Sequence, residues 1–233
     1  YGTRPEMIKM FPLIQKFKEK DIPFETLFSG QHVDLFKDFK KWLPDPDYTL
    51  DIMEKGQSLN HLTSKIFDQF QNMVFGNFSK YSKIKYVIVQ GDTTTAYAIA
   101  MAAFYNKIKV IHLEAGLRTH NKYSPFPEEM NRCLISKIAD IHLCPTEISV
   151  NNLKLEGITK NVYQVGNTVV DAFETILKEN EKNLVQETYL VTLHRRENRD
   201  KIYLLWDQLN EIAKTTRIIY LIHPSLKKEA YKY

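Results

Sequence analysis

The sequence VIHLEAGLRTHNKYSPFPEEMNR, residues 110–132, joins a short apolar run to the start of an amphipathic helix. The apolar run ends at Glu114, which is followed directly by Ala-Gly. Short runs rich in Val and Ile are typical of strands buried on both faces, as in a parallel sheet. In open parallel sheets the ligand crevice lies beyond the carboxyl ends of the strands. This stretch therefore predicts a parallel α/β fold with ionisable side chains at its crevice.

The rest of the chain repeats this alternation of apolar runs and amphipathic helical stretches. Strands are expected at residues 24–29, 85–90, 109–113, 140–144 and 162–166. Helices are expected at about residues 5–20, 57–79, 94–105, 127–139 and 146–156. This alternation predicts a mostly parallel sheet that is covered by helices on both faces.

A second α/β unit is expected after the sequence VGNTVVDAF, residues 165–173, which we interpret as a break. A charged, weakly structured stretch then leads to a strand, a helix and a strand at residues 188–193, about 201–213 and 217–222. We therefore predict an N-terminal Rossmann-like domain over residues 1–166 and the start of a second over residues 167–233. The first lacks its opening strand and the second is truncated, so the chain is expected to be a fragment of a longer protein.

The composition is that of a soluble globular protein, with 43% hydrophobic and 26% charged residues. The net charge of +4 comes from 32 basic and 28 acidic residues that are well mixed, which argues against binding to nucleic acid or to an anionic membrane. No apolar run approaches the roughly 20 residues of a membrane-spanning helix. Cys133 and Cys144 lack metal-ligand spacing and are expected to be buried, reduced thiols of a cytoplasmic protein.

The sequence GTRPEMIK, residues 2–9, combines a helix start with two cations. Thr3 and Glu6 fit a capping box. The helix dipole disfavours Arg4 and Lys9 near the N-terminus, but a bound phosphate would reverse the sign of that effect. The two side chains are therefore either solvated surface cations or part of an anion site. No GxGxxG or GxxxxGK[ST] sequence supports the second interpretation.

Carboxylates follow two of the expected strands. In VIVQGDTTTAYA, residues 87–98, Asp92 either caps the next helix or lies on the floor of the crevice. Glu114 is not placed as a cap, and a partly desolvated carboxyl is typical of a catalytic acid or base. Glu128 and Glu129 fit the ordinary chemistry of a helix N-terminus.

Histidines end two expected strands of the second unit. His194 precedes Arg195 and Arg196, and guanidinium groups bind diphosphates well. His223 stands alone before a proline, and a lone histidine at such a place usually has a structural role. The first of these sequences therefore favours a diphosphate-binding segment.

The chain resembles, in the order and spacing of its motifs, the non-hydrolysing bacterial UDP-N-acetylglucosamine 2-epimerases. The motifs that carry the resemblance are GTRPEMIK, SGQH, VQGDTTT, HLEAGLRT, SPFPEEMNR, GNTVVDA and HRREN. The resemblance runs from Gly2 to about Asn198 and continues more weakly to residues 223–224. It implies an α/β fold of two Rossmann-like domains in a glycosyltransferase-B arrangement, with the second domain incomplete in this chain. It also implies a homodimer, with UDP-sugar bound between the two domains.

The reaction implied by this resemblance interconverts UDP-GlcNAc and UDP-ManNAc. The bond between C1 and the UDP oxygen breaks, C2 loses its proton, and 2-acetamidoglucal and UDP form. UDP adds back after a proton returns on the other face of the sugar. Neither a metal nor a nicotinamide cofactor is implied, and the product would supply ManNAc units for surface polysaccharide.

The resemblance also implies roles for individual residues, assigned motif by motif. Residues implied to be catalytic are Asp92, Glu114, Glu128 and His194. Residues implied to bind the substrate are Arg4, Lys9, Arg118 and His223. Residues implied to lie near a second, activating UDP-GlcNAc are Gln31, His32, Arg195 and Arg196. One departure is Leu193, which stands where relatives often have Gly before the histidine.

Three alternatives remain at this point. A hydrolysing epimerase would release UDP and free ManNAc, but those relatives depart from this sequence just after Arg4, so Pro5 and Glu6 argue against it. A truncated remnant would bind a UDP-sugar, or a partner protein, without turnover. A sugar-transferring glycosyltransferase of the same architecture is disfavoured by the set of motifs.

Overall fold

The computed structural model describes residues 1–30, 40–76, 84–180, 188–193 and 202–222. The chain forms two compact units, Tyr1–Ile176 and Leu177–Tyr233, and each is described by itself. The predicted residues Gln31, His32, His194, Arg195, Arg196 and His223 lie outside the described residues.

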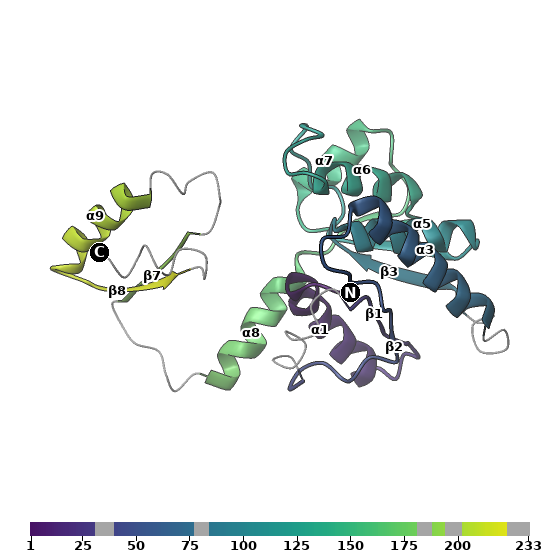
Figure 1. Ribbon diagram of the computed structural model, residues 1–233, viewed down its shortest axis with the longest axis horizontal. Coiled ribbons are helices and arrows are strands. Elements are labelled where there is room, and N and C mark those ends of the chain that lie inside the picture. The colour runs from purple at the N-terminus through teal and green to yellow at the C-terminus, as the bar shows by residue number, and fades with distance from the viewer. Residues whose placement is uncertain (31–39, 77–83, 181–187, 194–201, 223–233) are drawn as a thin grey trace. The chain divides into compact units, whose positions relative to one another are not determined.

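The first unit alternates strands and helices (Figure 1). Its strands are β1 (Leu27–Phe28), β2 (Tyr48–Thr49), β3 (Tyr86–Gln90), β4 (Lys109–Leu113), β5 (Ile141–Cys144) and β6 (Val162–Gln164). Its helices are α1 (Arg4–Glu19), α3 (Leu59–Gly76), α5 (Thr94–Tyr105), α6 (Glu128–Ile138), α7 (Glu147–Leu155) and α8 (Thr168–Asn180), the last of which continues past Ile176.

The main sheet has the strand order β3-β4-β5-β6, and all of its neighbouring strands are parallel. β1 and β2 form a separate parallel pair. The predicted parallel α/β fold is therefore confirmed. Parallel pairing also determines where a site can form, because the carboxyl ends of all strands of the main sheet lie at the same edge.

Apolar side chains of the main sheet alternate between two clusters. Val87, Val89 and Val110 pack into the cluster that contains α3 and α5. Ile88 and Leu113 pack into the cluster that contains α1. A strand that is covered on both faces must be apolar at successive positions, which explains the continuous apolar runs of the sequence.

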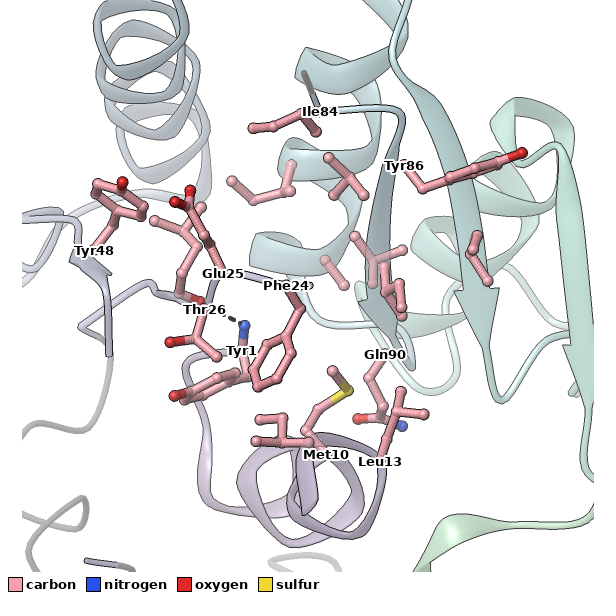
Figure 2. Close-up of a pocket in the computed structure, with 18 of the residues that line it drawn as sticks. Tyr1, Met10, Leu13, Phe24, Glu25, Thr26, Tyr48, Ile84, Tyr86 and Gln90 are labelled. Atoms are coloured by element: carbon pink, nitrogen blue, oxygen red, sulfur yellow. Dashed lines mark hydrogen bonds between the residues drawn. The ribbon is translucent and has the colours of Figure 1, made fainter. Parts of the chain in front are cut away.

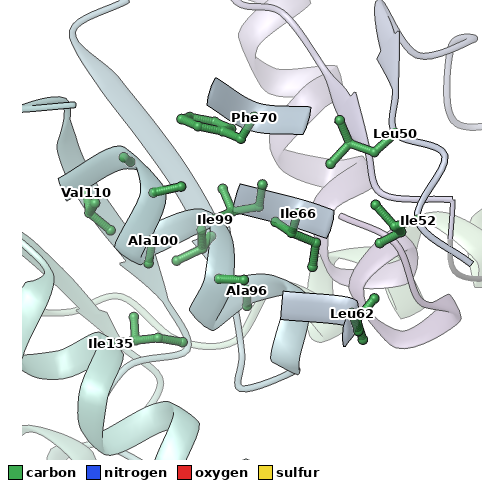
Figure 3. Packing of buried hydrophobic residues seen from close by; sticks show 14 residues of the cluster. Leu50, Ile52, Leu62, Ile66, Phe70, Ala96, Ile99, Ala100, Val110 and Ile135 are labelled. Atoms are coloured by element: carbon green, nitrogen blue, oxygen red, sulfur yellow. The ribbon is translucent and has the colours of Figure 1, made fainter. Parts of the chain in front are cut away.

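The larger cluster is built on the contact between α3 and α5 (Figure 3). Leu62, Ile66 and Phe70 of α3 stand four residues apart and share one helix face. They meet the small side chains of Ala96 and Ala100 on α5, which allow the two helices to approach closely. Each fully buried Leu, Ile or Phe side chain contributes roughly 1.5–3 kcal/mol to folding.

The region after β6 differs from the prediction. Residues 165–173 were predicted to form a break, but α8 begins inside them at Thr168. Asn167 starts the helix, because its Oδ1 accepts a hydrogen bond from the Val169 N–H at 3.1 Å. Ala172 is 1% exposed and packs into the α1 cluster with Met7 and Phe11. The prediction of a break was wrong, because Asn167 caps a helix there and Ala172 is buried against α1.

Two further differences concern short strands. The strand predicted over residues 24–29 is reduced to Leu27–Phe28. β2 was not predicted at all. Two-residue strands carry too few alternating positions for a periodic signal.

The second unit contains β7 (Thr188–Leu193), α9 (Ile202–Ala213) and β8 (Arg217–Ile222). β7 and β8 pair in parallel, and Ile202 and Trp206 of α9 form its small core. The predicted strand–helix–strand order is confirmed. Among the described helices of the chain, none is both long enough and apolar enough to cross a membrane.

Candidate active site

Ionisable and amide side chains gather where the strands of the main sheet end. Asp92 follows β3, Glu114 follows β4, and Asn167 follows β6. Lys9 reaches the same place from the second turn of α1, and its ammonium lies 2.5 Å from the Glu114 carboxylate. The strand ends therefore bring Lys9 and Asn167 into contact with Glu114, although Asn167 was not among the predicted site residues.

Glu114 is held by three side-chain donors. Its Oε2 accepts hydrogen bonds from Lys9 Nζ and from Gln90 Nε2, and its Oε1 accepts one from Asn167 Nδ2 at 3.0 Å. The side chain is only 12% exposed. Glu114 also has a φ of +68°, a left-handed conformation that non-glycine residues rarely adopt and that is found disproportionately at functional sites. The carboxylate is thus a negative charge fixed in one position.

Asp92 lies beside Arg132, whose Nη2 donates to its Oδ2. Burial raises the pKa of the Asp92 carboxyl, Arg132 opposes this rise, and the charges of Glu114 and Glu128 add to it. Glu114 and Glu128 are therefore near enough to Asp92 for their charges to disfavour its ionised form. A carboxyl whose pKa is raised by burial is suited to proton transfer.

The first turns of α6 organise the surroundings of Asp92. Asn131 donates from Nδ2 to the Asp92 carbonyl at 2.9 Å, and Arg132 binds the Asp92 carboxylate. Glu129 is 2% exposed and accepts hydrogen bonds from the backbone N–H groups of Thr119 and His120, each at 3.0 Å. Glu129 was predicted to take part only in ordinary helix-start chemistry, and its contact with the loop was not predicted. No local sequence signal reveals a contact with a loop that lies outside the helix.

A second buried carboxylate connects α1 to α5. The capping box predicted from Thr3 and Glu6 is present, and Glu6 Oε2 accepts from the backbone N–H groups of Gly2 and Thr3 at 2.8 and 2.7 Å. The other oxygen of Glu6 accepts from Thr93 Oγ1 at 2.6 Å. Thr93 in turn caps α5 by accepting from the Ala96 N–H at 3.0 Å. The turn that carries Asp92 is therefore anchored on both sides.

His112 contacts the same turn through the backbone of Gly91. It is fully buried, and its Nε2 lies 2.8 Å from the carbonyl oxygen of Gly91. Burial lowers the pKa of His112 to about 4, so the ring is neutral near pH 7.

The two remaining cations predicted to bind substrate lie in different surroundings. Arg4 is exposed at the first turn of α1, with no ion pair among the described residues. The Arg118 side chain is 1% exposed and binds Glu156 through Nε and Nη2 at 2.6 and 3.0 Å. Arg118 Nη2 also donates to Ser136 Oγ at 3.0 Å. These contacts join the loop after β4 to α6 and to the C-terminal end of α7.

Cys133 and Cys144 are free thiols, partly buried and buried respectively. Burial raises the pKa of Cys144 to about 11, which keeps that thiol protonated. Within the part of the chain that the structure describes, no group of three or more His, Cys, Asp or Glu side chains is arranged to hold a metal ion.

The chain is similar to proteins of one family. The family model described as UDP-N-acetylglucosamine 2-epimerase matches residues 15–233. The UDP-N-acetylglucosamine 2-epimerase of Salmonella borreze is 39% identical over 243 residues, which cover 96% of this chain and 63% of that protein. The Bacillus subtilis protein of the same name is 35% identical over 248 residues, which cover 100% of this chain and 64% of that protein. The chain therefore spans less than two thirds of these curated relatives.

Solved structures show the same likeness. The UDP-GlcNAc 2-epimerase from Neisseria meningitidis bound to UDP-GlcNAc aligns with a TM-score of 0.83 and 36% identity, covering 97% of this chain and 65% of that chain. The Methanocaldococcus jannaschii UDP-GlcNAc 2-epimerase in complex with UDP-GlcNAc and UDP aligns with a TM-score of 0.79 and 36% identity, covering 99% and 67%. The fold class predicted from the sequence is thereby confirmed.

Proposed function

Because the chain belongs to the UDP-N-acetylglucosamine 2-epimerase family, we propose that it interconverts UDP-GlcNAc and UDP-ManNAc without hydrolysis. The observation that carries this proposal is that Asp92 and Glu114 follow neighbouring parallel strands, with Lys9 bound to Glu114 and with the charges of Glu114 and Glu128 acting on Asp92. Carboxylates stabilise positive charge on a sugar ring, and cations stabilise negative charge on a diphosphate. These strand ends offer both kinds of side chain.

The reaction begins with cleavage of the bond between C1 and the UDP oxygen, in which UDP leaves with the electron pair. Positive charge then develops on the sugar ring and negative charge on the diphosphate. Loss of the C2 proton to a base gives 2-acetamidoglucal. Protonation of C2 from the other face and return of the UDP oxygen to C1 complete the epimerisation, so atoms and electrons balance without a redox partner.

The contacts divide the carboxylates between two tasks. Glu114, held by Lys9, Gln90 and Asn167, cannot turn freely and stabilises positive charge on the ring. Asp92, whose pKa is raised mainly by burial, is the carboxyl suited to exchange a proton with C2. Glu128 supplies the second carboxyl that transfer on the opposite face requires.

Cations are proposed to stabilise the leaving diphosphate. Arg4 is exposed at the N-terminus of α1, where backbone N–H groups and the dipole favour an anion. From the second domain, His194 is proposed to be catalytic and His223 to bind the substrate. An activating UDP-GlcNAc is proposed to bind near Gln31, His32, Arg195 and Arg196. The proposed assembly is a cytoplasmic homodimer whose product supplies surface polysaccharide.

Product analysis tests this function directly. The protein, including any continuation of its reading frame, is incubated with UDP-GlcNAc and followed by ¹H and ³¹P NMR. We expect UDP-ManNAc to appear with the diphosphate intact. Accumulation of free ManNAc and UDP would identify the hydrolysing reaction, and binding of UDP-GlcNAc without any product would identify a binding protein. Either result would contradict the proposal.

A further inference from the structure

Asn167 lies between β6 and α8, and its side chain makes two hydrogen bonds there. Its Oδ1 accepts from the Val169 N–H at 3.1 Å and so caps α8. Its Nδ2 donates to Glu114 Oε1 at 3.0 Å, across 53 positions of the chain. One amide therefore joins the start of a helix to a carboxylate that is proposed to be catalytic.

The cap determines which end of the amide faces Glu114. An asparagine side chain has one acceptor, its oxygen, and two N–H donors on its nitrogen. A backbone N–H can only donate, so the contact with Val169 requires the oxygen and leaves the NH₂ group to face Glu114. The amide can therefore donate to Glu114, and it cannot turn over to accept from Glu114 without losing the cap.

The other donors to Glu114 approach from the face of the main sheet that α1 covers. Lys9 lies on α1, and Gln90 of β3 lines the cavity in Figure 2 together with Met10 of α1. Both of these side chains donate to Oε2 of Glu114. Among the residues that the structure describes, only Asn167 donates a hydrogen bond to Oε1. Without its amide, the carboxylate would be held at one oxygen and could turn about that oxygen.

The start of α8 is itself fixed against α1. Ala172 of α8 is 1% exposed and packs with Met7 of α1. Lys9 follows two residues after Met7 on the same helix. The packing of α8 on α1 therefore sets the places of both Lys9 and Asn167, one for each oxygen of Glu114.

We propose that Asn167 is a positioning residue, whose amide holds the Glu114 carboxylate in the orientation that stabilises positive charge on the sugar ring. The catalytic consequence rests on the proposed function, whereas the hydrogen bond itself does not. Charge on the ring develops in the transition state, so loss of the amide should lower kcat and change KM little.

Three replacements separate the cap from the bond to Glu114. Asn167→Ser keeps a side-chain oxygen that can cap α8 but is too short to reach Glu114. Asn167→Asp keeps the cap and puts a carboxyl in place of the amide, whereas Asn167→Ala removes both contacts. Thr175→Ala is the control on the same helix, because Thr175 Oγ1 donates to the Asp171 carbonyl at 2.8 Å on an exposed part of α8.

The protein, including any continuation of its reading frame, is assayed for conversion of UDP-GlcNAc to UDP-ManNAc. We expect kcat to fall at least about tenfold in Asn167→Ser and in Asn167→Ala, with KM within about threefold of wild type. Tm should fall more in Asn167→Ala, because only that variant loses the cap. Thr175→Ala should keep the wild-type kcat.

The pH dependence of Asn167→Asp distinguishes a donor from a merely structural side chain. A protonated carboxyl at this position can donate its O–H to Glu114, whereas an ionised one repels the Glu114 carboxylate. The kcat of Asn167→Asp relative to that of Asn167→Ser should therefore rise at least about fivefold as the pH falls from about 8.5 to about 5.5.

Two kinetic results would overturn the proposal. A wild-type kcat in Asn167→Ser would show that the amide does not position Glu114. A ratio of Asn167→Asp to Asn167→Ser that stays constant with pH would show that the group at this position does not donate to Glu114.

Failure of the proposed function would be recognised separately. If the wild-type protein forms no UDP-ManNAc, the proposed function is contradicted, and the catalytic effect of Asn167 with it. The hydrogen bond is then decided by ¹³C NMR of the Glu114 side-chain carboxyl. We expect its resonance to move in Asn167→Ser and to stay in place in Thr175→Ala, and an unmoved resonance in Asn167→Ser would overturn the contact as well.

Discussion

The buried histidine beneath the Asp92 turn makes stability depend on pH in a direction that can be calculated. The pKa of His112 is lowered from 6.5 to about 4, mainly by burial. The charges of His142, Arg118 and Arg132 act in the same direction, whereas the hydrogen bond to Gly91 opposes it. A histidine of this kind is neutral in the folded protein and protonates readily only after unfolding.

The size of the effect follows from the two pKa values. The pKa of 6.5 minus that of about 4 leaves about 2.5, which at 1.36 kcal/mol per pKa unit corresponds to roughly 3 kcal/mol. This contribution to the free energy of unfolding is fully present above pH 6.5 and is lost progressively as the pH falls from about 6.5 to about 4.

Urea unfolding at half-unit steps from pH 7.5 to pH 4.5 measures this loss. Other groups titrate in the same range, so the informative quantity is the difference between the wild-type chain and His112→Gln. We expect the variant to be less stable at pH 7.5 but to lose less stability on acidification. His61→Gln is the matched control, because the His61 side chain is 46% exposed and its replacement should change the slope little. Parallel pH profiles for wild type and His112→Gln would refute the burial of a neutral imidazole beneath Gly91.

Three further changes test other contacts. Asn167→Asp places a second carboxyl 3.0 Å from Glu114 Oε1, so the two carboxyls should share a proton. Relative to Asn167→Ala, the free energy of unfolding of this variant should fall by about 1–3 kcal/mol between pH 4 and pH 8. A difference between the two variants that does not change with pH would contradict the contact between Asn167 and Glu114. Gly116→Ala adds a Cβ 2.2 Å from a backbone carbonyl oxygen at a φ of +84°, and it should lower the free energy of unfolding by more than about 2 kcal/mol. Gly157→Ala has a similar φ but open space around the added Cβ, and it should lower the free energy of unfolding by only about 1 kcal/mol. Equal losses of stability in thermal melts would refute the close approach at Gly116. In urea unfolding, Ile66→Ala should lower the free energy of unfolding by about 2–5 kcal/mol and Ile66→Val by about 0.5–1.5 kcal/mol. A small loss of stability in both variants would contradict the packing of α3 on α5.

Much of the fold could be predicted from the sequence because its signals are local. The apolar runs at residues 85–90 and 109–113 and the helix between them match β3, β4 and α5 within one residue. The break predicted at residues 165–173 was wrong, because α8 is stabilised by a cap at Asn167 and by burial of Ala172, and the second of these depends on tertiary packing.

The candidate site was predictable in outline for the same reason. Parallel strands deliver their carboxyl ends to one edge, so Asp92 and Glu114 had to lie on the same side of the sheet. The partners that fix these carboxylates were not predictable, since Asn167 reaches Glu114 from 53 positions along the chain and Arg132 reaches Asp92 from 40. Arg118 was predicted to bind the substrate, and its ion pair with Glu156, 38 positions along the chain, was likewise not predictable.

The central claim is that Asp92 and Glu114 act together on one UDP-sugar. Incorporation of deuterium at C2 of UDP-GlcNAc in D₂O tests it most directly. We expect time-dependent incorporation by the wild-type protein, with a loss of at least about a hundredfold in Asp92→Asn and Glu114→Gln, both folded by circular dichroism. Exchange at near wild-type rates in both variants would contradict the account.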